Sequence, residues 1–403
     1  MRRRDKDARK PLRIAAFGFR SLPPRAGAAG ADKFAFELLP RLAAMGCEVT
    51  AYTRIYPSDP SEPREGEFRG LRTVAFRTVG AKGFDTLLHS VKATWHILRH
   101  NTGDVVHIQN GGNSPFAGIL RLFGKKTFIS QDGPDWLREK WPWYAKLYLR
   151  AMQYVTAFAP NTIIFDNIFA QDHFQRKFGK AYHFIPFGAD VTYDPAAEVV
   201  LDRLGLERGK YFLFVGRFIP DKGLHYLVPA FERLDAPDMK LVLVGGSPNR
   251  AGYEARIHAT RDPRIVFPGY IYGPEMHALM KNARAYVQPS DVEGLSPVIL
   301  ESAYLGVPVI CSDIPQNRYV IRENALFFHA GDPGDLNARL AEALADPARL
   351  TTLAEAGRRH VAATYSWDQV ARDHIAVFRG APTSAPVRLA ASKQAAPEPV
   401  GWS

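Results

Sequence analysis

Two glutamates bound the most informative stretch of the chain, Asp291-Val-Glu-Gly-Leu-Ser-Pro-Val-Ile-Leu-Glu301. Pro297 suits the first turn of a helix, where its missing N–H costs nothing, so Glu301 is predicted about one turn inside that helix. The N–H groups at a helix start bind anions, and carboxylates accept hydrogen bonds from sugar hydroxyls. The stretch therefore indicates a site for a phosphorylated sugar. The alternative is that Glu293 and Glu301 only favour the helix start, but a carboxylate among apolar neighbours needs partners.

A second stretch, Val215-Gly-Arg-Phe-Ile-Pro-Asp-Lys-Gly223, joins a predicted strand to a predicted helix. Arg217 can bind phosphate oxygens through its forked guanidinium, and Lys222 can do so as a point charge. The alternative is a solvated loop. A third segment, 18–30, is glycine-rich but is not a dinucleotide fingerprint. The sequence contains no P-loop, and its His, Cys and Asp residues lack metal-ligand spacing.

The fold that positions these segments can be predicted from the hydrophobic pattern. The chain alternates short apolar runs with amphipathic stretches. This alternation is typical of parallel sheets covered by helices, and it occurs twice, so we expect two α/β Rossmann-like domains. Ligands bind outside the carboxyl ends of such strands, which predicts a cleft between facing domains. The expected strands are 12–18, 48–53, 104–108, 126–130, 162–165, 182–186, 211–216, 241–245, 265–268, 285–288 and 307–311. The main expected helices are 32–45, 222–234, 297–305, 334–345, 347–364 and 366–378.

Composition limits the class of protein. The chain has 403 residues, 46% of them hydrophobic and 23% charged, which excludes a disordered chain and suggests two domains. No segment approaches the roughly 20 apolar residues of a membrane span, and no apolar signal segment follows the basic start. The cysteines, Cys47 and Cys311, lie in apolar contexts, so we expect no disulfide framework and a reducing cytoplasm.

Positive charge is concentrated in one half of the chain. Residues 1–190 carry a net charge of +12, and residues 191–403 carry −1. This asymmetry indicates either a solvated surface or an anionic partner such as a membrane or a phosphorylated acceptor. Within the basic half, residues 136–158 interleave Trp and Tyr with Lys and Arg. Such a segment is either a core-facing helix or one that lies at a membrane surface. A nucleic-acid partner is not expected, because no continuous basic stripe or known module is present.

Together these motifs resemble the retaining GT-B glycosyltransferases of family four. The resemblance extends over most of residues 211–378, including Gly216–Gly223, Val244-Gly-Gly246 and Gly306-Val-Pro-Val309. In the N-terminal half, Phe19–Arg25 and Met45–Thr50 resemble bacterial members that build surface polysaccharides, some of them rhamnosyltransferases.

The resemblance implies a role for each matching residue. Arg217 and Lys222 would neutralise the donor diphosphate, and Glu293 would contact the donor sugar. Relatives commonly have His-Gly where this chain has Asp132-Gly133. Asp132 would accept a hydrogen bond from a sugar hydroxyl or stabilise an oxocarbenium-like transition state, or it is a plain turn residue. The remaining residues implied in donor binding are Glu301 at the ribose, the N–H groups of Gly294, Leu295 and Ser296, and Gly30, Gly216 and Gly245.

The resemblance also implies the organisation and the activity. The expected parts are an acceptor-side domain over 1–195 and a nucleotide-sugar domain over 196–365, which starts with a linker over 196–210. A helix over 366–379 is expected to cross back to the first domain, and a disordered tail is expected over 380–403. The expected activity is retaining, metal-independent transfer from a nucleotide sugar to a polyprenyl-pyrophosphate-linked glycan at the inner face of the cytoplasmic membrane. The alternatives are a soluble small-molecule acceptor and a non-catalytic scaffold that binds a nucleotide sugar.

Overall fold

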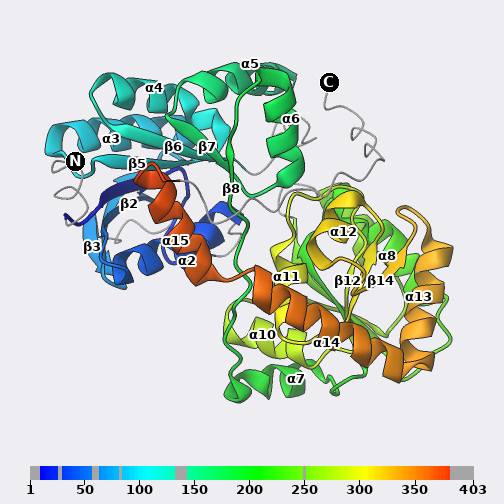
Figure 1. Cartoon of the computed structure of the whole chain (residues 1–403). Helices are drawn as coiled ribbons and strands as arrows, with labels where there is room; N and C mark the ends of the chain where they lie inside the picture. Colours follow the sequence, from blue (N-terminus) through cyan, green and yellow to red (C-terminus); the bar gives the residue numbers. More distant parts are fainter. Residues whose placement is uncertain are drawn as a thin grey trace. The chain divides into compact units, whose positions relative to one another are not determined.

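The computed structural model describes residues 10–25, 30–56, 63–80, 84–131, 143–247 and 251–381. It divides the chain into two compact units, the first made of Met1–Phe187 with Trp367–Ser403, and the second of Gly188–Ser366. Each unit contains a mainly parallel sheet covered by helices (Figure 1). The expected pair of Rossmann-like α/β domains is therefore confirmed.

The first unit is built on an eight-stranded sheet in the order β3-β4-β2-β1-β5-β6-β7-β8. All neighbours are parallel except β3 and β4. The central strands are almost fully buried, as expected of a parallel sheet whose two faces are covered. The strands are β1 (Arg13–Phe17), β2 (Glu48–Ile55), β3 (Glu65–Phe68), β4 (Leu71–Arg77), β5 (Val105–Gln109), β6 (Lys126–Gln131), β7 (Thr162–Phe165) and β8 (His183–Phe184).

Helices cover both faces of this sheet. Figure 1 shows α3 (Phe84–His100), α4 (Ser114–Leu122) and α5 (Trp143–Phe158) along one side of the sheet, and α2 (Gly30–Ala44) with α15 (Trp367–Phe378) along the other. The short η1 (Gly111–Asn113) precedes α4, and α6 (Ile168–Phe178) follows β7. Helix α15 packs on α2, so the chain returns to the first unit after it completes the second.

The second unit has a six-stranded parallel sheet in the order β11-β10-β9-β12-β13-β14. Its core joins Phe212 and Leu241 on the strands to Leu227 and Leu336 on the helices. The strands are β9 (Tyr211–Arg217), β10 (Lys240–Gly246), β11 (Ile265–Gly269), β12 (Ala285–Gln288), β13 (Val309–Ser312) and β14 (Leu326–Phe328). The helices are η3 (Pro195–Glu198), α7 (Val199–Leu204), η4 (Pro220–Lys222), α8 (Leu224–Glu232), α9 (Ala251–His258), α10 (Pro274–Lys281), α11 (Pro297–Tyr304), α12 (Pro315–Ile321), α13 (Pro333–Ala345) and α14 (Pro347–Thr364).

Several local expectations are corrected by the structure. Residues 196–210 were expected to form a linker, but they begin with η3 and α7, which pack on α10 because Val200 and Leu201 are buried. The hairpin of β3 and β4 was not expected, since the exposed Glu-Gly-Glu-Phe of β3 carries no apolar alternation. Strand β14 and helix α12 were also missed. Most of the expected tail, residues 382–403, lies outside the described residues.

Candidate functional site

Two loops of the second unit meet at the carboxyl edge of its sheet. Gly223 follows η4 with φ of 69°, and a Cβ placed there would lie 1.8 Å from the carbonyl oxygen of Pro289. Only glycine fits both the backbone angle and this close approach. The Asp291 N–H also donates to the Asp221 carbonyl over 3.0 Å. The loop after β9 is therefore held against the segment after β12, its neighbour in the sheet.

This contact brings together two residues singled out from the sequence. Lys222 Nζ donates to Glu293 Oε1 in an ion pair. The Lys222 side chain is 21% exposed and that of Glu293 is 7% exposed. The Gln288 amide donates to the same Glu293 oxygen and also to Ser290 Oγ at 2.7 Å. Two donors therefore fix the Glu293 carboxylate, while the ammonium of Lys222 keeps some access to solvent.

Glu301 lies on the buried side of the network formed by Lys222, Glu293 and Gln288. It is buried in α11, whose first turn is capped by the Ser296 hydroxyl, which accepts from the Ile299 N–H at 3.4 Å. Tyr286 is fully buried on β12, and its hydroxyl donates to Gln288 Oε1. Burial raises the pKa of Tyr286 well above its usual value, and the Glu293 and Glu301 carboxylates raise it further. Both carboxylates therefore influence the pKa of the Tyr286 hydroxyl, although Glu293 and Glu301 are eight positions apart in sequence.

The turn between the two glutamates leads directly into α11. Gly294 is half-buried, while Leu295 and Ser296 are buried, so the backbone of this turn is fixed by its surroundings. The Ser296 hydroxyl also donates to Gln288 Oε1 at 3.4 Å. Gln288 thus links the turn, Tyr286 and Glu293. Sequence reasoning missed both Gln288 and Tyr286, and the only available signal was a glutamine at the end of an apolar strand.

A glycine contact shapes the neighbouring part of this edge. Gly216 on β9 pairs with Gly245 on β10, which has φ of 132°. A Cβ at Gly245 would lie 1.9 Å from the Gly216 carbonyl oxygen, so a side chain at position 245 cannot be accommodated without moving the backbone. The two predicted glycines are therefore side by side where β9 and β10 end.

Arg217 ends β9 with an exposed side chain. Burial raises the pKa of the nearby Tyr270, and the charge of Arg217 acts in the opposite direction. The Tyr270 ring stacks on Tyr272 with centroids 6.1 Å apart, and both rings are partly exposed. These tyrosines were not anticipated from the sequence. They place an aromatic surface beside a cation at the edge that also holds Lys222 and Glu293.

A half-buried acid close to this edge was also missed. Asp291 Oδ2 accepts from the Tyr226 hydroxyl at 3.3 Å. Burial raises the pKa of Asp291, whereas the Tyr226 hydrogen bond and the charge of His225 lower it. The carboxyl is therefore less acidic than a solvated aspartate, and it lies two residues before Glu293.

The first unit holds the remaining predicted residues. Gly30 is the first residue of α2, and no atom of the described residues outside that helix lies within 4 Å of where its Cβ would stand. Asp132 lies outside the described residues. His107 is buried on β5 and contacts Ser130 Oγ at 2.7 Å, and burial with a smaller effect of His374 holds its pKa well below the usual value. The structure thus groups Lys222, Glu293 and Glu301 in the second unit, and it places Gly30 in the first.

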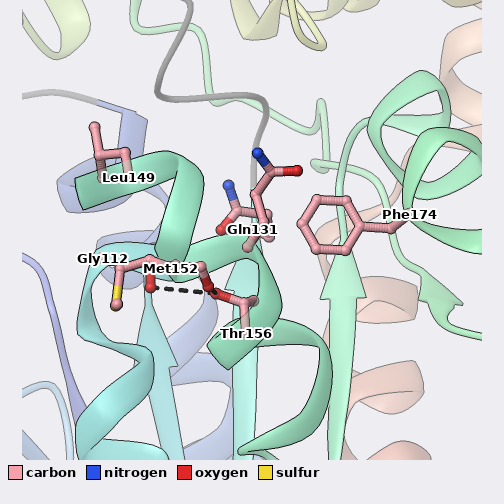
Figure 2. A pocket seen from close by; sticks show the side chains of 8 residues that line it. Gly112, Gln131, Leu149, Met152, Thr156 and Phe174 are labelled. Carbon is pink, nitrogen blue, oxygen red and sulfur yellow. Dashed lines mark hydrogen bonds between the residues drawn. The ribbon is translucent and has the colours of Figure 1, made fainter. Parts of the chain in front are cut away.

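A hollow in the first unit lies where β6 ends at Gln131 (Figure 2). Thr156 Oγ1 donates to the Gly111 carbonyl at 3.3 Å, and Lys177 Nζ donates to Gln153 Oε1 at 3.3 Å. The lining combines two glutamines with apolar side chains from α5 and α6. It consists of Gly111, Gly112, Gln131, Leu149, Met152, Gln153, Thr156 and Phe174.

Two further general features of the described ranges concern metal ligation and membrane-spanning helices. Within them, no group of three or more His, Cys, Asp or Glu side chains is arranged to hold a metal ion. Among the helices of these ranges, none is both long and apolar enough to cross a membrane.

Comparison with known families agrees with the division into two units. Residues 28–193 match the family described as Glycosyltransferase Family 4, and residues 202–360 match Glycosyl transferases group 1. The chain therefore carries the domain pair of a GT-B glycosyltransferase, and the expected fold class is confirmed.

Individual relatives cover the chain to different extents. O-antigen chain mannosyltransferase B of Escherichia coli is 26% identical over 185 residues, which are 45% of this chain and 48% of the relative. The chain spans about half the length of the curated relatives it matches. Among solved structures, sucrose-phosphate synthase of Thermosynechococcus elongatus has a TM-score of 0.78 and 23% identity, covering 92% of this chain and 99% of that one. Anabaena Alr3699/HepE in complex with UDP-glucose has a TM-score of 0.72 and 16% identity, with coverage of 91% and 99%.

Proposed function

We propose that the protein transfers a sugar, with retention of configuration, from a nucleotide-sugar donor that binds at the carboxyl edge of the β9–β12 sheet. One observation carries the proposal: a lysine and a glutamate that are 71 positions apart are paired beside a second buried glutamate. An ammonium suits a diphosphate, and fixed carboxylates suit sugar hydroxyls. A single edge of the sheet therefore offers both kinds of recognition that a nucleotide sugar requires.

Each residue has a distinct part in the proposed reaction. Lys222 and Arg217 stabilise the negative charge that grows on the diphosphate as the bond to the sugar breaks. Glu293 holds hydroxyls of the donor sugar, and Glu301 holds those of the ribose. The N–H groups of the 294–296 turn add further donors. Because these groups supply the positive charge that a cation supplies elsewhere, we propose that transfer proceeds without a metal ion.

The acceptor is proposed to bind in the first unit. The hollow beside Gln131 and Gln153 has room for about one water molecule, so an acceptor would bind at its rim, where the two amide groups can bind hydroxyls. We propose that Asp132, which follows Gln131 in the sequence, accepts a hydrogen bond from a sugar hydroxyl or stabilises the transition state. A glycan is therefore the acceptor class that these side chains favour.

We further propose that this glycan is linked to a polyprenyl pyrophosphate and that the enzyme works at the inner face of the cytoplasmic membrane, in bacterial surface polysaccharide synthesis. The likeness to an O-antigen mannosyltransferase supports this acceptor, and so does the charge of +12 in residues 1–190. Rhamnose is one donor sugar to test. A soluble acceptor and a non-catalytic scaffold are the alternatives.

Screening the purified protein against a panel of nucleotide sugars tests the proposal. We expect one donor to raise the melting temperature and to be hydrolysed slowly without acceptor, with and without a chelator. Binding without hydrolysis or transfer would favour the scaffold. Loss of activity in chelator, restored by a divalent ion, would contradict metal independence.

A further inference from the structure

Most of the exposed large apolar side chains of the described residues lie on three helices of the first unit. Leu122 and Phe123 at the end of α4 are 87% and 66% exposed, and Trp143 at the start of α5 is 76% exposed. Trp95 on α3 is 68% exposed. The helices are neighbours, since α4 packs against both α3 and α5. We call their exposed apolar side chains, together with the cations of the same helices, the outer face. Monomeric soluble proteins rarely leave so many large apolar groups uncovered on adjacent elements.

The spacing of these side chains follows the helical repeat. On α3 they occur at positions 84, 87, 91 and 95, so they share one flank of the helix. On α5 they occur at 143, 144, 147, 148, 154 and 158. The opposite sides of α3 and α4 pack on the sheet through residues such as Ala93, Ile97 and Leu120, and α5 packs against β7. The helices therefore have a second apolar side that nothing in the described part of the chain covers.

The charges on these helices indicate what kind of partner covers the outer face. The three helices carry five cations, Lys92, Arg99, Arg121, Lys146 and Arg150. Their one acidic residue, Asp85, is buried and accepts from the Val79 N–H at 2.9 Å. None of the five cations forms a salt bridge with any described residue. By contrast, α2 and α15 on the other side of the sheet carry acids that pair with Arg41.

We propose that the outer face of α3, α4 and α5 docks on an anionic lipid bilayer, a proposal that rests on the membrane location proposed above and names the surface responsible. Exposed Trp and Tyr beside Lys and Arg match the apolar boundary and the anionic headgroups of a bilayer. Lys92 and Arg121 donate to backbone carbonyls, which leaves their charge uncompensated. A second copy of the chain would place these five positive charges against five more, which opposes dimerisation through this face.

Docking through this face also has a consequence for the acceptor. Helix α5 contributes Leu149, Met152, Gln153 and Thr156 to the hollow beside Gln131, while other residues of the same helix belong to the outer face. One helix therefore connects the docking surface with the proposed acceptor site. A lipid-linked glycan held in the bilayer would reach that site over a short path.

Sedimentation of the full chain with vesicles tests the proposal. We expect the protein to pellet with phosphatidylglycerol vesicles at low salt, to be released as salt rises, and to ignore phosphatidylcholine vesicles. Replacing Leu122, Phe123 and Trp143 together with Ser should lower partitioning at least tenfold. Lys146→Gln with Arg150→Gln should weaken binding most at low salt. The matched controls are Val199→Ser and Arg359→Gln in the second unit, both at exposed positions, which should bind like the wild type.

The failure of this proposal can be distinguished from failure of the proposed activity. All the replaced side chains except the half-buried Lys146 are exposed, and all are distant in sequence from Lys222 and Glu293. The melting temperature and donor hydrolysis should therefore not change. Wild-type protein that stays in the supernatant, or outer-face variants that pellet normally, would overturn the docking surface. So would a dimer in sedimentation velocity that the same serine variants abolish. Vesicle binding by a protein that hydrolyses no donor would leave the surface standing and refute the activity.

Discussion

Lys222 and Glu293 form an ion pair in which the glutamate is the more deeply buried partner. The pair lies where the loops after β9 and β12 meet, and Gln288 supplies a second donor to the same carboxylate oxygen. A half-buried cation next to a fixed carboxylate is suited to exchange its partner for an anionic ligand. In the proposed donor complex the ammonium would contact the ligand, while the carboxylate would keep its hydrogen bond from Gln288.

Removing the ammonium should reduce transfer much more than it reduces stability. For Lys222→Ala we expect a loss of about 10²–10³ in turnover, because a preorganised charge at a leaving group contributes about 3–4 kcal/mol. Steady-state kinetics with the identified donor measures this loss. The matched control is Lys210→Ala, which breaks an exposed pair with Glu207 and should leave turnover unchanged. Equal activity of the two variants would contradict the assignment of Lys222.

Glu301 should be needed for donor affinity. Its carboxylate is buried in α11, so Glu301→Gln preserves its shape and removes its charge. We expect weaker binding of the nucleotide sugar, by at least tenfold, with a folded protein by circular dichroism. Calorimetric titration measures the dissociation constant. The exposed Glu355 gives the control, because Glu355→Gln should bind donor like the wild type.

Gly223 should be replaceable only at a high cost in stability. Alanine at a backbone φ near 70° costs about 1–2 kcal/mol by itself. At Gly223 the added Cβ also collides with the Pro289 carbonyl, whereas at Gly209, with φ of 73°, no atom lies within 4 Å. Gly209→Ala therefore isolates the backbone term. Urea unfolding should show a clearly larger loss for Gly223→Ala, and equal losses would mean that the two loops are not held together as described.

Much of this edge could be anticipated from the sequence because its residues are near one another along the chain. Glu293, Pro297 and Glu301 fall within one turn-and-helix pattern, and Gly216 with Lys222 falls within one strand-loop-helix pattern. The pairing of Lys222 with Glu293 was not predictable, because it depends on β9 and β12 being neighbours. Gln288 and Tyr286 were missed for the same reason: their partners come from folding, and an apolar strand conceals them.

The outer face was only partly foreseen. The aromatic and basic composition of 136–158 left open a core-facing helix or one at a membrane surface, and in the structure α5 exposes Trp143, Tyr144 and Leu147. The contribution of α3 and α4 depends on which side of each helix packs on the sheet. A helix that is apolar on two sides shows no clear periodicity, so its exposed side cannot be distinguished from its core side in the sequence.

Stability should fall as the pH drops below about 6.5. Burial lowers the pKa of His374 to about 4, and burial with the charge of Arg54 lowers the pKa of His89 to about 3. In the unfolded chain both rings take up a proton near pH 6.5, so the unfolded state binds more protons than the native state between that pH and about 4. The stability contributed by these neutral rings is thus present above pH 6.5 and is lost as pH falls, by at most about 1.4 kcal/mol per unit for each ring. Urea unfolding at several pH values should show a flatter slope for His374→Gln than for the wild type, and equal slopes would contradict this prediction.

The last helix should be essential for the first unit although it follows the second in sequence. Trp367, His374 and Phe378 of α15 are fully buried, and the Trp367 ring lies 5.7 Å from that of Phe34 on α2. Ending the chain after Thr364 would remove these groups and expose the apolar side of α2. We therefore expect the chain truncated after Thr364 to unfold or aggregate, while truncation after Gly380 should leave the melting temperature unchanged.

Because a truncated chain can fail to express, Trp367→Ala provides a second measurement, with an expected loss in the free energy of unfolding of about 3–5 kcal/mol for a buried tryptophan. The exposed Trp95→Ala is the matched control and should be close to neutral. If both tryptophan variants unfolded at the same urea concentration as the wild type, the packing of α15 on α2 would not contribute to stability.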